Sequence, residues 1–183
     1  MRIIAGTARS LPLKSVPGME TRPTTDRIKE TLFNILQDDV PGSYFLDLFA
    51  GSGQIGLEAL SRGARYAVFV DNGKKAVACI EDNIRFTKFG KETKLYPTDI
   101  LSALRAMEGT YQFDIIFMDP PYNQKMEKDV LRYLATSSLL KENTMIIVEA
   151  SLDTEFDYLD EYGLELTRLK TYKTNEHAFI RKK

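Results

Sequence analysis

Short apolar runs alternate along most of the chain with segments in which apolar residues recur every three to four positions. The runs predict strands, and the recurring positions predict helices that each bury one face. Strands are expected at residues 44–49, 66–70, 93–96, 113–118 and 144–149, with helices near 54–62, 74–86, 100–107 and 126–134 between them. Such alternation requires parallel strands with helices on both faces of the sheet.

The first part of the chain departs from this alternation. Residues 2–5 and 11–14 predict a small β-hairpin around a turn. Thr24 or Thr25 can then cap a helix whose apolar positions repeat along one face, and Pro41-Gly42 ends it. We therefore expect an N-terminal appendage, followed by a helix that packs against the main sheet.

The last part of the chain departs in another way. Two strand-like runs, 164–172 and 177–181, are separated by only four residues. A gap that short permits a hairpin but no crossover, so this pair must be antiparallel. The predicted fold is an α/β fold with a Rossmann-like, seven-stranded, mostly parallel sheet, an antiparallel C-terminal hairpin and a small N-terminal hairpin.

Composition narrows the classes further. The 183 residues, 43% of them hydrophobic, fit a single domain, 1–183, with an appendage at 1–22 and a catalytic core at 23–183. No apolar run approaches the roughly 18 residues of a membrane helix, and the N-terminus lacks a signal-peptide layout, so a cytoplasmic location is expected. Cys79 and His177 are the only cysteine and histidine, so no disulfide framework and no metal site are predicted, and we expect Cys79 in the core and His177 in a strand near a loop. The net charge of −1 argues against nucleic-acid binding by bulk charge.

A glycine-rich segment follows the first strand of the alternation. Gly51, Gly53 and Gly56 match the pattern G-x-G-x-x-G, and the next helix offers free N–H groups to an anionic part of a ligand. Asp71 lies twenty residues beyond Gly51, where a ribose-binding acid is expected. The segment alone does not separate a nicotinamide enzyme from a methyltransferase.

The turn Asp119-Pro120-Pro121-Tyr122 directly follows another predicted strand. An acid side chain and a carbonyl held by proline can each accept one N–H of a planar amino group, and the aromatic ring can stack on the base that carries it. The alternative is an ordinary strand-exit turn, since aspartate and proline are common turn formers. A clamp of this kind suits methylation of an exocyclic amine.

A third acid separates the two enzyme classes. Asp99 follows the third strand, where a methyltransferase needs an acceptor for the adenine amino group of its cofactor. A dehydrogenase needs neither this acid nor the clamp, and it would want a substrate domain for which little chain remains after residue 150. We therefore favour a methyltransferase, with ligands bound at the carboxyl ends of the strands.

Three segments together resemble one known family. They are RPTTDRIKETLFN at 22–34, DLFAGSG at 47–53 and DPPY at 119–122. They resemble the RsmD family, class I methyltransferases that act on the N2 amino group of a guanine in small-subunit rRNA, of the type that modifies guanine 966 of 16S rRNA. The likeness covers essentially the whole chain.

The resemblance implies S-adenosyl-L-methionine as cofactor and a role for each matching residue. The cofactor-binding residues that it implies are Asp47, Gly51, Gly53, Asp71, Asp99 and Ile100. Asp71 would accept the ribose hydroxyls and Asp99 the adenine amino group, with the Ile100 N–H available to a ring nitrogen. The implied catalytic residues are Asp119, Pro120 and Tyr122.

The implied partner is 16S rRNA, within an assembled or assembling small ribosomal subunit. The target guanine would have to be unpaired or turned out of its stack. Basic side chains outnumber acidic ones within residues 1–35. The candidates for RNA contact in the appendage and in the C-terminal turn are Arg9, Lys14, Arg22, Lys173 and Asn175.

Two other functions stay open. A DNA adenine-N6 methyltransferase could use the same turn, although 183 residues leave little room for a target-recognition domain. A non-catalytic, S-adenosylmethionine-binding module that binds RNA is the other, and three carboxylates gathered at one edge argue against it.

Overall fold

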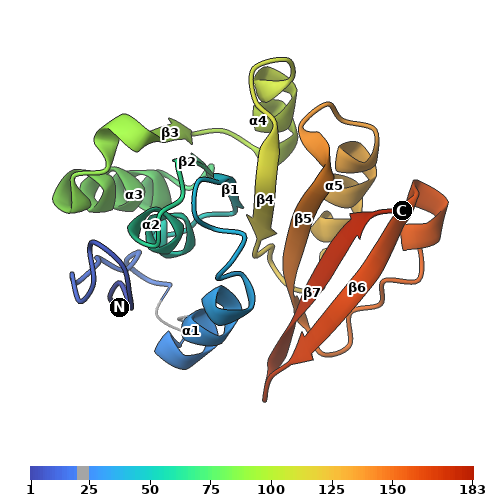
Figure 1. Ribbon diagram of the computed structural model, residues 1–183, viewed down its shortest axis with the longest axis horizontal. Helices are drawn as coiled ribbons and strands as arrows, with labels where there is room; N and C mark the ends of the chain where they lie inside the picture. The colour runs from blue at the N-terminus through green and yellow to red at the C-terminus, as the bar shows by residue number, and fades with distance from the viewer. Residues whose placement is uncertain (20–24) are drawn as a thin grey trace.

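The computed structural model of the protein describes residues 1–19 and 25–183. The strands are β1 (Tyr44–Leu48), β2 (Tyr66–Val70), β3 (Thr93–Tyr96), β4 (Phe113–Met118), β5 (Leu140–Ser151), β6 (Leu164–Thr171) and β7 (Asn175–Lys182). The helices are α1 (Asp26–Ile35), α2 (Gln54–Ser61), α3 (Lys74–Thr87), α4 (Ile100–Met107) and α5 (Met126–Ala135), with short 3-10 turns at Gly90–Glu92 and Leu159–Tyr162. In this part of the chain the strands form one sheet in the order β3-β2-β1-β4-β5-β7-β6 (Figure 1).

The sheet is parallel from β3 to β5 and antiparallel beyond it. β1 pairs in parallel with β2 on one side and with β4 on the other, and β4 pairs in parallel with β5. β7 enters between β5 and β6 and runs antiparallel to both. The predicted seven-stranded sheet with its antiparallel C-terminal hairpin is confirmed. The strand order reverses between β1 and β4, the position where open α/β sheets bind their ligands.

Helices cover both faces, each over its own hydrophobic core. On one face, side chains of α4 and α5 pack on strand residues such as Leu48, Met118 and Val148. On the other face, α1, α2 and the N-terminal segment pack on alternate strand residues such as Phe117 and Ile147. Neighbouring residues of a strand point to opposite faces. The residues in these two cores therefore show which face of the sheet the side chain at the end of each strand lies on.

The helix at the N-terminal side begins as expected. The Thr25 hydroxyl accepts a hydrogen bond from the Ile28 N–H and caps α1, while Thr24 lies outside the described residues. The predicted hairpin before it reduces to a single antiparallel bridge between Arg2 and Pro12. Its hydrogen bonds run from the Ile3 N–H to the Leu11 carbonyl and from the Leu13 N–H to the Met1 carbonyl, whereas the Leu11 N–H donates to the Ala8 carbonyl within the turn, so the ladder does not continue.

The turn of this N-terminal segment packs tightly against α2. Gly6 has a φ of +88°, and a Cβ built there would lie 1.8 Å from the Ser61 carbonyl oxygen. The Thr7 N–H donates to that same oxygen at 2.8 Å. Residues 1–19 are therefore docked on the helix that follows the glycine-rich loop.

Two strand boundaries were wrong. β5 runs over Leu140–Ser151, longer than the predicted 144–149, and β7 begins at Asn175 rather than at residue 177. Both extensions contain polar residues, which interrupt the apolar pattern. The extended ends still pair with a neighbouring strand: Leu140 pairs with Phe113, and Asn175 pairs with Ser151. The ends of these two strands are determined by pairing with a neighbouring strand, and the local sequence pattern carries no information about that pairing.

Candidate active site

Two of the predicted acids lie on either side of the same residue of β1. Leu48 pairs with Val70 of β2 and with Met118 of β4, and Asp71 and Asp119 each come one residue later. Because adjacent strands lie about 4.8 Å apart, the two backbone positions are separated by roughly 10 Å. The sequence prediction that these acids gather at the carboxyl edge, at the reversal of strand order, is confirmed by this register.

The glycine loop between β1 and α2 has the conformation that its sequence predicts. Gly51 and Gly53 have φ values of 59° and 80°, and no side chain caps α2 at Gly53. A Cβ built on Gly51 would meet nothing within 4 Å, whereas one on Gly56 would lie 2.4 Å from the Phe69 ring. Gly51 thus leaves open space for a ligand at the start of the helix, and Gly56 lets the helix pack closely on β2.

Asp71 is held by backbone groups from two turns. One carboxylate oxygen accepts the Gly51 N–H and the other accepts the Gly73 N–H, each at 2.9 Å. The side chain is half-buried, and each oxygen can still accept a second donor. It could therefore hold two neighbouring hydroxyl groups in a fixed orientation.

Asp99 and Ile100 form the start of α4. The Asp99 carboxylate accepts the Ser102 N–H at 2.9 Å, and its hydrogen bonds with Ser102 keep the pKa of this exposed acid below its usual value. Ile100 is the first residue of the helix, and its side chain is buried. Asp99 thus stays ionised at the edge, beside the backbone of Ile100.

Asp47 has a different position from the other acids. It is 1% exposed, and its carboxylate accepts the Gly56 N–H at 2.9 Å from beneath the glycine loop. Burial raises the pKa of Asp47 well above its usual value, the Gly56 hydrogen bond opposes that rise, and the charge of Asp71 adds to it. Its geometry is that of a support for the loop, and its predicted contact with the cofactor stays a prediction.

The turn 119–122 follows β4 directly, as the sequence predicts. Asp119 and Tyr122 are half-buried and Pro120 is buried. Asn123 and Lys125, with φ values of 61° and 54°, then lead into α5. The turn therefore begins, at Asp119, at the same edge of the sheet as Asp71.

A second polar cluster continues this edge, and sequence reasoning missed it. Glu149 in β5 is 4% exposed and pairs with His177 of β7. One of its oxygens accepts the Asn175 amide at 3.0 Å, and the other lies 3.3 Å from His177 Nε2. Tyr172 Oη lies 3.0 Å from His177 Nδ1.

The protonation states in this cluster follow from burial. Burial raises the pKa of Tyr172 to about 12, and the charge of Glu149 adds to that shift. The phenol therefore keeps its proton. Because a carboxylate only accepts, the tautomer that satisfies both contacts has its Nε2–H donating to Glu149 and its Nδ1 accepting from Tyr172. His177 is a strand residue beside a turn, as predicted, and it is fully buried.

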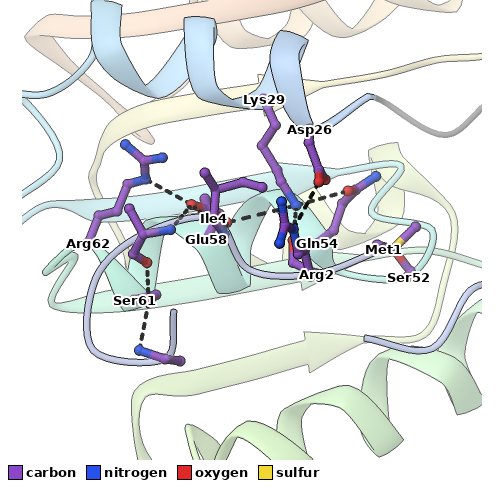
Figure 2. Close-up of polar contacts among 12 residues, drawn as sticks. Met1, Arg2, Ile4, Asp26, Lys29, Ser52, Gln54, Glu58, Ser61 and Arg62 are labelled. Atoms are coloured by element: carbon purple, nitrogen blue, oxygen red, sulfur yellow. Dashed lines mark hydrogen bonds and ion pairs between the residues drawn. The ribbon is translucent and has the colours of Figure 1, made fainter. Parts of the chain in front are cut away.

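Figure 2 shows a buried lysine that joins the N-terminal segment, α1 and α2. Lys29 is fully buried; its Nζ donates to the Arg2 carbonyl and to Gln54 Oε1 and lies 3.8 Å from Glu58 Oε2. Burial lowers the pKa of Lys29, and the charge of Glu58 opposes that shift. Lys29 is thus fixed beside Gln54, the first residue of α2.

Glu58 completes the same junction from the side of α2. Its carboxylate accepts the N–H groups of Ile4 and Ala5, at 2.9 and 3.1 Å, and Arg62 Nε at 2.9 Å (Figure 2). In the sequence Lys29 is one of several basic residues near the N-terminus, and nothing in its local pattern marks it as buried. The junction supports the helix on which the glycine loop ends.

The predicted RNA-contact residues fall into different environments. Arg9 and Lys173 are exposed, and exposed Lys14 pairs with Asp82 at 2.9 Å. Arg22 lies outside the described residues. Asn175 is only 3% exposed and donates to Glu149, so its side chain faces the protein interior rather than solvent.

The structure also bears on Cys79, on membrane-spanning helices and on metal sites. Cys79 is buried at 5% exposure, and its Sγ donates to the Lys14 carbonyl, in keeping with core packing. Among the described residues, no helix is long and apolar enough to cross a membrane. The same residues contain no group of three or more His, Cys, Asp or Glu side chains arranged to hold a metal ion.

Comparisons with known proteins match most or all of the chain. The family model described as "Conserved hypothetical protein 95" matches residues 1–181. A Bacillus subtilis protein named "Putative rRNA methyltransferase YlbH" is 37% identical over 185 residues, which cover 100% of both chains. The Haemophilus influenzae protein named "Ribosomal RNA small subunit methyltransferase D" is 36% identical over 156 residues, 84% of this chain and 80% of its own.

Solved structures agree with these relatives. An Escherichia coli structure described as "Putative methyltransferase yhhF" superposes with a TM-score of 0.85 at 30% identity and covers 100% of this chain and 98% of that one. The chain therefore has the Rossmann-like methyltransferase fold, with the antiparallel hairpin at its C-terminal edge.

Proposed function

Because the chain belongs to the Conserved hypothetical protein 95 family, the RsmD-type methyltransferases, we propose that it methylates the N2 amino group of a guanine in small-subunit rRNA. The methyl donor in this proposal is S-adenosylmethionine, and the place of action is the cytoplasm. The observation that carries the proposal is the register that brings Asp71 and Asp119 to either side of Leu48, beside an open glycine loop.

The residues on the β2 and β3 side suit an adenosine carrying an amino acid. Asp71 is oriented by two backbone N–H groups and can take both ribose hydroxyls. Asp99 and the Ile100 N–H can take the adenine edge. At the start of α2 the Asp47 carboxylate accepts the Gly56 N–H, and the N–H groups before it in the first turn can be offered to a carboxylate. This donor and acceptor set fits S-adenosylmethionine, which supplies a methyl group on a positively charged sulfur.

The residues on the β4 side suit a planar amine. The guanine amino nitrogen is a poor nucleophile, since its lone pair is delocalised into the ring. Asp119 and the Pro120 carbonyl would accept its two N–H groups, orient the nitrogen and favour the positive charge that develops as it attacks. Tyr122 would stack on the base and keep it at reacting distance.

The rRNA partner in this proposal comes from the relatives rather than from bulk charge. The curated relative from Haemophilus influenzae is named for the small subunit, and the chain matches 80% of its length. Exposed Arg9 and Lys173 are the described candidates for phosphate contact. We propose that the substrate is an assembled or assembling small subunit and that the contacted bases are unpaired.

Transfer of labelled methyl groups tests the proposal. Purified protein is incubated with S-adenosyl-[methyl-³H]methionine and, in parallel, with unmodified small ribosomal subunits, naked 16S rRNA and DNA. We expect label in N2-methylguanosine of the rRNA. Label in N6-methyladenine of DNA would instead support the adenine enzyme. Cofactor binding by calorimetry with no transfer to any of the three would support a non-catalytic module.

A further inference from the structure

Glu149 continues the row of acids onto the next strand. β4 and β5 are parallel, with Phe117 opposite Ile147 and Met118 opposite Val148, so Asp119 and Glu149 each lie one residue farther on. Phe117 and Ile147 share the face that α1 and α2 cover, and Asp119 and Glu149 follow them by two residues. The alternation of side chains therefore directs both acids to that face, from backbones about 4.8 Å apart.

The partners of Glu149 are two side chains of β7. Asn175 and His177 each donate to one of its oxygens, and within residues 1–19 and 25–183 its only ion-pair partner is the histidine. A carboxylate this buried is costly unless donors or a cation compensate it. Each oxygen can accept one more hydrogen bond, so the pair of donors orients Glu149 and still leaves it able to accept from a ligand.

We propose that Glu149 determines the choice of base by accepting the ring N1–H of guanine while Asp119 holds the N2 amino group. The inference rests on the proposed function and extends it to base selection. Guanine is the base whose amino group lies next to a ring N–H, whereas adenine and cytosine carry a ring nitrogen acceptor beside theirs. Two neighbouring carboxylates match the two neighbouring donors of guanine, and they would face an acceptor in the other bases.

The surrounding cluster fixes the geometry of this carboxylate. The His177 ring is held edge-on between Phe117 and Tyr172, with ring centroids 5.9 and 5.0 Å away. The hydrogen bond from Tyr172 to Nδ1 leaves the Nε2–H directed at Glu149. Tyr172, Asn175 and His177 are therefore positioning residues, which act on the base through Glu149.

A base analogue provides the first test. 2-Aminopurine has the same exocyclic amino group as guanine but carries no hydrogen on N1. Small subunits are reconstituted with guanine or 2-aminopurine at the nucleotide that the wild-type protein labels, and single-turnover transfer is measured on both. We expect guanine to react about 10- to 150-fold faster, the span of a hydrogen bond to a charged group. Equal rates on the two bases would overturn the inference without any variant.

Glu149→Gln provides the second test, with Glu176→Gln as its matched control. The glutamine keeps the size of the side chain and an acceptor for Asn175, while its amide can rotate to donate to N1 of 2-aminopurine. We expect the preference for guanine to fall at least about tenfold, with cofactor affinity unchanged. Glu176 is the neighbouring buried acid of β7, on the opposite face, and its variant should keep the wild-type preference.

The outcomes separate this inference from the proposed function. If Glu149→Gln slows both bases by the same factor, Glu149 has a structural role only and the inference is wrong, although guanine methylation stands. If the wild-type protein transfers no methyl group to guanine in any small-subunit substrate, the proposed function fails, and the base preference fails with it.

Discussion

The two halves of the carboxyl edge are built in different ways. On the β1 to β3 side, the acids are held by backbone N–H groups of the loops and turns that follow the strands: Asp47 by Gly56, Asp71 by Gly73 and by Gly51 twenty residues away, and Asp99 by Ser102. On the β5 to β7 side, Glu149 is held by side chains 26 and 28 residues away. The first half is therefore a set of local turns, and the second depends on strand pairing between distant segments.

Because they depend on different contacts, the two halves can be damaged separately. A change in a local turn should alter the binding of the predicted cofactor and leave the β5–β7 pairing intact. A change on the other side should alter selection or reaction of the base and leave cofactor binding intact. Each prediction below tests that separation, starting with the largest effect.

Asp119→Ala should have the largest effect on turnover. It removes the acceptor that orients the amine and favours its developing charge, so we expect methyl transfer to fall about 100- to 1,000-fold. Cofactor affinity, measured by calorimetry, should stay within about twofold of wild type. Asp119→Asn, which keeps one acceptor oxygen, is the control and should lose less. Robust turnover by Asp119→Ala would remove this residue from its role.

Asp71→Ala should weaken the cofactor on the other side of β1. Loss of hydrogen bonds to a charged group should raise the dissociation constant for S-adenosylmethionine about 10- to 150-fold. The preference for guanine over 2-aminopurine should not change. Asp129→Ala, which removes an exposed acid of α5, is the control for a simple loss of charge. Unchanged cofactor affinity in Asp71→Ala would contradict the assignment.

Asp47→Asn should distinguish a support from a contact. Burial raises the pKa of Asp47 in the folded state, so its contribution to stability is fully present below its usual value of 3.8 and is lost as the pH rises toward the raised value. The asparagine avoids that loss and still accepts the Gly56 N–H. Its melting temperature relative to wild type should therefore rise as the pH increases above about 4, by about 2–4 °C. A difference that shrinks as the pH rises would show that the sign is wrong.

Lys173→Ala should have the smallest effect. The side chain is exposed on the turn between β6 and β7, so we expect binding to small-subunit rRNA to weaken about two- to fivefold. The slope of log affinity against log salt should fall by about 1. Lys91→Ala, an exposed lysine beside β3 at the far end of the sheet, is the control. Equal losses in both variants would mean that the C-terminal turn makes no particular contact.

The same contrast explains what the sequence could predict. Strands such as β2 and β4 are apolar runs bounded by polar residues, and an acid directly after such a strand lies at the carboxyl edge whatever the rest of the fold does. Asp71 and Asp119 could therefore be placed together from the sequence. Glu149 also ends an apolar run. Its side chain meets His177 only because β7 runs antiparallel beside β5, and the sequence around Glu149 does not contain that pairing.

The buried lysine shows a second limit. Lys29 lies in a helix whose pattern predicts only that one face is apolar, and a count of charges treats it as solvated. Its burial follows from three segments that meet, residues 1–5, α1 and α2, and from Glu58 as its partner. The predicted strand pairing of the N-terminal hairpin was too long. The segment has a single bridge, and its docking on α2, which local sequence does not reveal, holds its shape.

The position of β7 has a consequence for synthesis of the protein. This strand is the last of the described elements in chain order, yet it lies inside the sheet between β5 and β6 (Figure 1). While a ribosome is still translating residues 175–182, β5 is an unpaired, apolar edge strand of the nascent chain. Exposed edge strands of this kind can pair with other chains and cause aggregation. The parallel half can fold before that moment, so the growing polypeptide should form the turns that hold Asp71 and Asp99 first and the Glu149–His177 cluster last.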